Sequence, residues 1–421
     1  MTAVLDDVTH APIDVEPAAT TPTDSWHDFT HTWSAHSVSS FGDHFTMVAL
    51  PLATYLRTHS AFTVGAVAAM EAVAVLVLGL VAGALSDRWR RRPVLVLTDY
   101  ARALVVGLLA VGVVSDSYPV ALLFGAALVL GLLRVVHDAS EAAVVPILVD
   151  GPRLLRANSR LQASDSAAIA AGPAIAGGLI AIGGPALAFA GDALSFAASG
   201  TVMRSVRRLD VHDPQPVRAA SRPRLRSQIS EGCRALWADS DMMRAVVLLA
   251  VMNVVVTAAE AQFIPYAKQI LGIGAVGIGA YMALGGLVAV ATSVVVGRRS
   301  QMRGDMMLLG VIVFAVGFIV AGVWPSFLTA GVAFFGAGFG SALAGAHFYA
   351  LRHARFPVSM QGRVSMVSRT ALTSLVPAAY LLGGWFSRHQ GPDALFVAVG
   401  CIGLGACLWG VCTSLRRLRI G

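Results

Sequence analysis

The sequence predicts an all-α integral membrane protein with twelve transmembrane helices. Of its 421 residues, 56% are hydrophobic and 13% are charged, and the mean hydropathy is +0.70. A soluble protein of this length would be more polar. A helix needs roughly 20 mainly apolar residues to cross the hydrocarbon core of a bilayer. Twelve segments meet this requirement: 33–56, 62–84, 94–114, 118–137, 161–182, 185–204, 245–268, 275–297, 305–323, 325–349, 364–386 and 393–414.

The positive charges lie in alternate loops between these segments. Lys268 is the one lysine among 31 basic residues. If the N-terminus is cytoplasmic, the even-numbered loops and the C-terminal tail hold nearly all of the arginines, and the opposite loops hold little beyond Arg57, Lys268 and Arg388. Because basic residues are retained on the cytoplasmic side, we expect a multi-pass protein of the cytoplasmic (inner) cell membrane with both termini inside. The net charge of +7 then reflects topology and indicates no nucleic-acid partner.

The loop after the second predicted span combines a glycine, an acid and a cluster of arginines. Gly83 stands four residues before the acid, and the charged residues are Asp87, Arg88, Arg90, Arg91 and Arg92. The loop resembles the motif Gly-x-Leu-x-Asp-Arg-x-Gly-Arg-Arg of the major facilitator superfamily of transporters, with an arginine in place of the second glycine. The resemblance implies a gate, in which Gly83 lets span 2 approach span 11 and Asp87 holds the cytoplasmic side closed. The alternative is that the arginines only set the topology.

The chain divides into two halves. Residues 1–32 carry acids but no Lys or Arg, so we expect a disordered acidic cytoplasmic tail and not a signal peptide. A polar segment at 205–244 is predicted to be a cytoplasmic linker between six-helix bundles at 33–204 and 245–414, followed by a short tail at 415–421.

A weak repeat with an offset of 207 residues relates these halves. It pairs six residues of each half in equivalent loops: Arg91, Arg92, Arg156, Gly184, Pro185 and Phe189 with Arg298, Arg299, Arg363, Gly391, Pro392 and Phe396. The resemblance implies two pseudo-symmetric bundles with a substrate site between them near the midplane.

The end of span 4 holds an arginine within an apolar helix. Such a residue usually pairs with a carboxylate or lines a water-filled cavity. Arg134, with His137 and Asp138 after it, resembles the family motif Arg-x-x-Gln-Gly, and this implies a role in proton coupling; a structural ion pair is the alternative. We expect His137 to be a solvated residue near the cytoplasmic surface. Asp99 and Arg102, three residues apart in span 3, are expected to pair with each other.

Span 5 holds a proline among glycines. Gly172, Pro173, Gly177 and Gly178 resemble the Gly-Pro-x-x-Gly-Gly antiporter motif of drug/proton exporters, with Ala176 in place of the first paired glycine. The resemblance implies export in exchange for protons. An ordinary kinked membrane helix is the alternative.

Four further acids are candidates for carrying a proton across the membrane. Asp43 and Glu71 lie about 10 residues into spans 1 and 2 and therefore near the midplane. Asp192 in span 6 and Glu260 in span 7 complete the set. A carboxylate in a low-dielectric environment holds its proton more readily than one in water and can exchange it near neutral pH. We expect Glu71 or Asp43 to carry the coupling proton, and an acid also to attract a cationic substrate.

Short segments narrow the resemblance, which covers about residues 33–414. Ser40–Asp43, Ala49–Leu52, Gly191–Phe196 and Gln361–Val364 resemble the branch with the enterobactin exporter and the tetracycline and macrolide efflux pumps. Aromatic and thioether side chains are available to line a substrate cavity, although most such residues pack or anchor helices. The candidates are Phe263, Tyr266, Tyr281, Met282, Phe334, Phe335 and Tyr349.

We therefore expect a proton-coupled exporter of a small amphipathic molecule, such as a drug, a siderophore or another metabolite. A proton-coupled nutrient importer is the runner-up, and a non-transporting receptor or scaffold is a third possibility. Lys268 lies outside any phosphate-binding Gly-x-x-x-x-Gly-Lys sequence, and we find no metal-ligand cluster and no nucleophile–base pair. We expect no enzyme activity, no cofactor and no bound metal, and we expect a monomer whose partners are the bilayer, protons and the small-molecule substrate.

Overall fold

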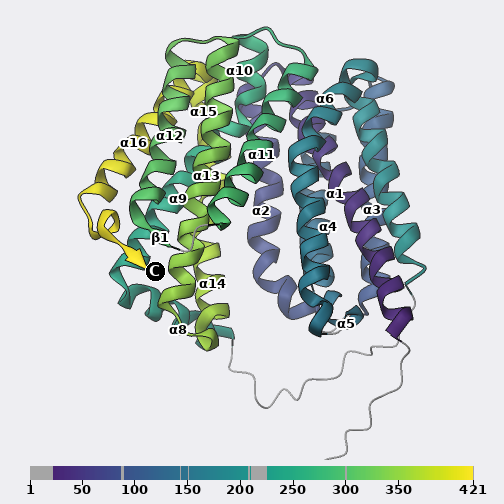
Figure 1. Cartoon of the computed structure of the whole chain (residues 1–421). Helices are drawn as coiled ribbons and strands as arrows, with labels where there is room; N and C mark the ends of the chain where they lie inside the picture. Colours follow the sequence, from purple (N-terminus) through teal and green to yellow (C-terminus); the bar gives the residue numbers. More distant parts are fainter. Residues whose placement is uncertain are drawn as a thin grey trace, which may run out of the picture.

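A computed structural model shows a helical protein whose two halves stand side by side (Figure 1). It describes residues 22–86, 90–142, 144–149, 151–206, 209, 225–298 and 301–420. Within these residues, strand structure is limited to one antiparallel pair, β1 (Met302–Arg303) and β2 (Arg419–Ile420). The expected all-α membrane fold is confirmed.

The described residues of the first half form six helices, of which α5 is a short connector. They are α1 (Pro22–Thr58), α2 (Ala61–Ser86), α3 (Arg91–Val114), α4 (Val120–Glu141), α5 (Val145–Leu148) and α6 (Gly151–Met203). The helix α6 is interrupted at Gly183 and Gly184, whose backbone angles are not helical. The break separates the two predicted spans at 161–182 and 185–204, so α6 makes two passes.

The second half repeats this plan with more interruptions. Its helices are α8 (Leu225–Ala238), α9 (Ser240–Ala261), α10 (Phe263–Gln269), α11 (Ala275–Gly297), α12 (Gly304–Val323), α13 (Phe327–Arg355), α14 (Val358–Thr373), α15 (Val376–Gln390) and α16 (Pro392–Val411). A 3₁₀ turn, η1 (Ser414–Arg417), precedes β2. The pairs α9–α10 and α14–α15 each form one pass. The described residues thus hold six passes in each half, as the sequence predicts.

Two predicted boundaries need correction. The first helix begins at Pro22 and not near residue 33, and Phe29 and Thr32 are buried, so residues 22–32 are not part of an unfolded tail. The predicted linker at 205–244 contains the helix α8, which packs against α14, where Arg363 forms an ion pair with Glu231. The part of the linker next to the second half is therefore a folded helix.

The helix α3 shows how the bundle is oriented towards lipid. Its large apolar residues Leu97, Leu104 and Val111 are 71%, 64% and 67% exposed, whereas Asp99 and Arg102 on the opposite face are buried. A soluble bundle would show the reverse arrangement, with apolar side chains inside. By length and composition, nine helical segments among the described residues can cross a membrane. This count takes the doubly spanning α6 once and does not include α1 or the pair α14–α15.

The repeat between the halves reappears as a shared backbone conformation. Gly184 and Gly391 have φ angles of +67° and +94°, and a proline follows each of them. A side chain strains the backbone in this region, whereas glycine adopts it readily. Phe189 and Phe396, the equivalent aromatic residues, are both buried. The two hairpins therefore turn by the same device.

The two halves touch closely near the end of the molecule where α10 lies (Figure 1). A methyl group at Gly384 of α15 would lie 3.1 Å from the Cα atom of Phe62 of α2. The Gln262 side-chain amide donates a hydrogen bond to the Ala61 carbonyl, at 3.2 Å. Small residues allow this approach, as is usual for helices packed in lipid. These contacts close the α10 end of the space between the halves.

Candidate functional site

A cavity of about 470 Å³ lies between the two halves. The first half lines it with residues of α1, α2, α3, α4 and α6, and the second half with residues of α9, α10, α11, α13 and α15. Its charged lining consists of four acids and two arginines: Asp43, Glu71, Asp192, Glu260, Arg102 and Arg134. All five proton-coupling candidates named from the sequence therefore line one cavity, and Arg102 joins them.

Asp43 of α1 forms an ion pair with Arg102 of α3. The Nη2 atom of Arg102 lies 2.5 Å from Oδ1 of Asp43, and the arginine side chain is 4% exposed. The guanidinium carbon also lies 4.1 Å from the ring centroid of Phe196, within cation–π range. The predicted pair of Arg102 with Asp99 is therefore wrong. The packing of α1 against the first-half bundle brings the Asp43 carboxylate to Arg102 instead.

Asp192 of α6 is completely buried on the wall of the same cavity. It accepts hydrogen bonds from the Thr46 hydroxyl of α1 and from the Ser195 hydroxyl, the second at 3.2 Å. Hydroxyl groups satisfy the carboxyl oxygens without neutralising a charge. Asp192 therefore lies close to the α1 helix that carries Asp43, but with neutral hydrogen-bond partners.

Glu71 of α2 pairs with Arg134 of α4. The Arg134 Nη1 atom lies 3.4 Å from Oε1 of Glu71, and its Nε atom lies 3.9 Å from Oδ2 of Asp138. The Arg134 and Glu71 side chains are 49% and 40% exposed, which places this pair at the accessible surface of the cavity. The expectation that Arg134 has a carboxylate partner is thus met, while its role in coupling stays a prediction.

Glu260 of α9 differs from the other three acids. It lines the cavity from the second half, and among the described residues it has no hydrogen-bond or ion-pair partner. An unpaired carboxylate inside a membrane bundle is costly unless it is protonated or binds a cation. Among the described residues, Glu260 is therefore the one acid of this cavity whose carboxyl group, exposed to the cavity, has neither a counter-ion nor a hydrogen-bond donor.

His137 of α4 is more deeply enclosed than the sequence predicts. His137 is 5% exposed, and its Nε2 atom lies 3.2 Å from Oδ1 of the fully buried Asp99. The Ser199 hydroxyl donates a hydrogen bond to the other oxygen of Asp99, at 2.7 Å. The prediction of a solvated histidine is thus wrong, because α3 packs against α4 and places the buried Asp99 carboxylate next to the ring.

A second histidine links three helices close to this point. The His36 nitrogens of α1 lie 2.7 Å from Glu141 and 2.8 Å from Asp165. Among the described residues, His137, Asp138 and Glu141 offer ligand atoms within 4.8 Å of one another, a spacing that a metal ion would require. Because His137 and Glu141 are already engaged by acidic and histidine partners, we assign no metal here, and the expectation of no bound metal stays a prediction.

The aromatic candidates are divided between packing and cavity positions. Met282 and Phe334 line the central cavity, and Tyr349 lines a second cavity described below. Four candidates are absent from the linings of both cavities: Phe263, Tyr266, Tyr281 and Phe335. Phe263 is buried and its ring packs against that of Phe334. The Tyr266 and Tyr281 hydroxyls donate hydrogen bonds to backbone carbonyls, and Phe335 is 46% exposed. These four residues line neither of these two cavities, and a role for them in substrate binding stays a prediction.

The glycine–proline motif of α6 forms a contact between the halves. A methyl group at Gly177 would lie 2.6 Å from the carbonyl oxygen of Ala275 on α11, and one at Gly279 would lie 3.0 Å from the Cα atom of Gly177. Gly172 packs against His44 of α1, whereas a methyl group at Gly178 would meet no described atom within 4 Å. Pro173 lines the central cavity. The motif thus lets α6 and α11 pack at backbone distance.

The predicted gate is described in part. Asp87 and Arg88 lie outside the described residues, as does the environment of Gly83 in α2. Arg91 begins α3, and the Arg92 guanidinium donates a hydrogen bond to the Arg204 carbonyl after α6. The gate stays a prediction.

Several cavity residues were missed by sequence reasoning. The sequence spacing pairs Arg102 with the wrong carboxylate, and it gives no signal for His44, Thr46 and Tyr380, although each lines the cavity. The one available signal was a polar residue in an apolar span, and this signal does not say which face of a helix meets the neighbouring helices.

Comparisons with known proteins agree with this architecture. The family model of the Major Facilitator Superfamily matches residues 32–379, more than half of the chain. Among solved structures, a bacterial homologue of the iron transporter ferroportin in an inward-facing state is 16% identical, with 92% of this chain and 98% of that chain covered and a TM-score of 0.73. A search of curated proteins found no match.

Two further structures have the same fold with other cargo in their descriptions. A POT family transporter in complex with 5-aminolevulinic acid is 11% identical, covering 92% of this chain and 96% of that chain, with a TM-score of 0.71. A nucleoside transporter is 8% identical, covering 91% and 99%, with a TM-score of 0.66. At these identities the structures show the fold alone.

The chain therefore belongs to the Major Facilitator Superfamily. It is a multi-pass membrane transporter of a small-molecule substrate and not an enzyme, as the sequence predicts.

Proposed function

We propose that the protein exports a small amphipathic molecule across the cytoplasmic membrane in exchange for protons. The observation that carries this proposal is the charge of the central cavity, where four carboxyl groups face two guanidinium groups and Glu260 has no ion-pair partner among the described residues. A surplus of acids in a low-dielectric site favours the binding of protons or a cation.

Competition for these carboxyl groups is a simple way to couple the two fluxes. A proton that enters from outside neutralises Glu260, and the neutral site releases a cationic substrate group. Protonation of Asp43 or Glu71 would in addition weaken its pair with Arg102 or Arg134 and loosen contacts between helices. Each ligand shifts the balance between the two orientations of the halves through its different affinity for them.

The motif at Gly172–Gly178 favours export over import. It resembles the antiporter motif, and it lies at the contact between α6 and α11 near the α10 end of the halves. With both termini cytoplasmic, the α10 end of the molecule faces outside. Because the contacts between the halves close that end, the two halves are in an inward-facing arrangement. We also propose that the protein is related to the branch with the enterobactin exporter and the tetracycline and macrolide efflux pumps, which its short sequence segments resemble. Import of a nutrient with protons is the runner-up, and the charged cavity disfavours a scaffold without transport.

The direct test uses the purified protein in proteoliposomes with an imposed pH gradient and a panel of amphipathic solutes. We expect the solute to move in the direction opposite to the flow of protons. This movement should stop when a protonophore collapses the pH gradient. Solute movement in the same direction as the protons would favour the importer instead. Flux indifferent to both the pH gradient and the membrane voltage would contradict proton coupling in either direction.

Single neutralisations locate the proton. Glu260→Gln, Glu71→Gln and Asp43→Asn remove one carboxylate each while keeping its approximate shape. Asp116→Asn is the matched control, because Asp116 lies in the exposed turn after α3, outside the cavity. We expect at least one cavity variant to lose gradient-driven transport while the control retains it. Wild-type rates in all three cavity variants would remove the basis of the mechanism.

A further inference from the structure

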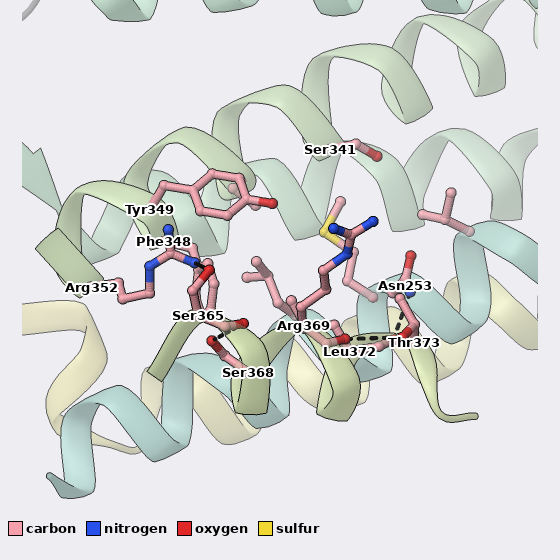
Figure 2. A pocket seen from close by; sticks show the side chains of 15 residues that line it. Asn253, Ser341, Phe348, Tyr349, Arg352, Ser365, Ser368, Arg369, Leu372 and Thr373 are labelled. Atoms are coloured by element: carbon pink, nitrogen blue, oxygen red, sulfur yellow. Dashed lines mark hydrogen bonds between the residues drawn. The ribbon is translucent and has the colours of Figure 1, made fainter. Parts of the chain in front are cut away.

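A second cavity, of about 560 Å³, lies within the second half of the protein (Figure 2). The helices α9, α13 and α14 form its walls. Among the residues that the structure describes, its lining contains two arginines and no aspartate or glutamate. The polar side chains that line it include Asn253, Ser341, Arg352, Ser365, Arg369 and Thr373. Its charge is thus opposite in sign to the surplus in the central cavity.

Arg352 of α13 is held in place by neutral groups. Its Nη1 atom donates a hydrogen bond to the Ser365 hydroxyl at 3.0 Å, and its guanidinium carbon lies 5.1 Å from the ring centroid of Tyr349. The Nε atom is buried and has no hydrogen-bond partner among the described residues. A buried donor without a partner costs roughly 1–3 kcal/mol. The charge of Arg352 is therefore positioned but not neutralised.

Arg369 of α14 is the freer of the two cations. Its side chain forms no hydrogen bond or ion pair with any described residue, and it is exposed to the cavity that it lines. Figure 2 shows it extending from α14 towards α13, where Ser341 lies. Arginine at membrane depth usually has a carboxylate, a phosphate or a backbone carbonyl as its partner. The fold supplies Arg369 with none of these among the described residues.

The two cavities meet at one residue. Ser341 of α13 lines both the acidic central cavity and the arginine-lined cavity. A ligand that spans this point would have one end near carboxylates and the other near guanidinium groups. Charged hydrogen bonds from arginine to carboxylate or phosphate are among the strongest in proteins.

We propose that the arginine-lined cavity is a subsite for the anionic group, a carboxylate or a phosphate, of the transported molecule. The substrate is then a zwitterionic amphiphile, whose cationic end lies among the acids of the central cavity. This inference rests on the proposed function, because it takes the central cavity to be the path of the substrate.

Binding of a matched set of aryl probes tests the subsite without any proton gradient. Phenylbutyrate, phenylbutanol and phenylbutylamine share a ring and a chain but differ in charge. Ligand-dependent thermal stabilisation of the full-length protein in phosphatidylcholine nanodiscs reports their affinities. We expect phenylbutyrate to bind the wild type more tightly than phenylbutanol does.

The deciding variant is Arg369→Gln, because this side chain has no described partner whose loss would disturb the fold. We expect it to weaken phenylbutyrate binding at least about tenfold, the equivalent of one charged hydrogen bond, and to leave phenylbutanol unchanged. Arg298→Gln, at the exposed C-terminal end of α11, is the matched control and should bind as the wild type does. Equal affinity of the wild type and Arg369→Gln for phenylbutyrate would overturn the proposal.

A second arm identifies the source of the anion. Phosphatidylglycerol is added to the nanodiscs in place of part of the phosphatidylcholine. Weaker phenylbutyrate binding in the wild type, but not in Arg369→Gln, shows that lipid phosphate also occupies the site; unchanged binding assigns the site to soluble anions. Because no gradient is applied, failure of proton coupling in the transport assay would leave this result intact, and the two failures are distinguishable.

Discussion

Individual charged residues in this bundle are compensated in different ways. Arg102 is enclosed by the Asp43 carboxylate and the Phe196 ring, whereas Asp192 relies on hydroxyl groups. Glu260 has neither kind of partner among the described residues. These differences decide which acid can change its protonation state without first breaking an ion pair.

The Asp43–Arg102 pair leads to a prediction about stability. Asp43→Ala leaves the 4% exposed Arg102 side chain without its carboxylate, and breaking a buried pair in this way costs about 3–5 kcal/mol. The double variant Asp43→Ala/Arg102→Leu removes the stranded charge and should lose less stability than the single variant. Apparent melting temperatures in detergent, compared in a double-mutant cycle, measure the difference. A double variant less stable than Asp43→Ala alone would show that the pair is not an isolated structural unit.

At the scale of elements, close helix contacts depend on where glycine is placed. Within the α6 motif, a methyl group at Gly177 would meet the backbone of α11, whereas one at Gly178, the next residue, would meet no described atom within 4 Å. The motif is therefore more than a kink in one helix, because one of its glycines holds the halves together at the α10 end.

Neighbouring glycines provide a test of this contact. Gly177→Ala places a methyl group 2.6 Å from the Ala275 carbonyl oxygen, so α6 and α11 must separate. We expect a reduced transport rate and a shift in the orientation of the halves, measured by the accessibility of cysteines placed in the cavity. Gly178→Ala should behave as the wild type. If both alanine variants transport equally well, the contact does not control the movement.

The two hairpin glycines permit a second test of an element. Gly184→Ala and Gly391→Ala force a side chain into backbone with positive φ, at a cost of about 1–2 kcal/mol each. Gly405→Ala lies in α16 with open space around it and should be neutral or slightly stabilising. Thermal unfolding of the three variants gives the comparison. Equal melting temperatures would mean that the hairpins relax to other turns.

On the scale of the whole molecule, transport by rocking requires the contacts near α10 to open. Phe62 of α2 and Gly384 of α15 belong to opposite halves and approach closely, while Gly310 and Ala344 approach within the second half. The first pair joins the two halves, and the second pair lies within one half. They therefore separate movement of the halves from stability of one bundle.

Cysteine cross-links turn this difference into a prediction. In a background with the four native cysteines replaced by serine, the pair Phe62→Cys/Gly384→Cys should form a disulfide that stops transport, and reduction should restore it. The pair Gly310→Cys/Ala344→Cys should be cross-linked without losing transport, because each half moves as a rigid body. Full activity of the oxidised inter-half pair would contradict a rocking mechanism.

Much of the architecture could be predicted from the sequence alone. The sequence predicts the twelve apolar segments, the glycine–proline repeat of the hairpins and the five charged candidates of the central cavity. These features depend on the length and hydropathy of single segments and on the cost of burying a charge, which are properties of the local sequence. The starts of α1 and α8 were missed, since amphipathic turns next to a membrane span do not stand out in hydropathy.

The pairing of charges was decided by the tertiary structure. Sequence spacing placed Asp99 with Arg102, whereas packing gave Arg102 to Asp43 and Asp99 to His137. The arginine-lined cavity likewise required α9, α13 and α14 to meet. Burial along one helix depends on the local sequence, but the partner of a buried charge depends on which helices lie across from it. The sequence by itself therefore determined the membrane fold and the residues inside it, and the packing of helices determined which of those residues meet.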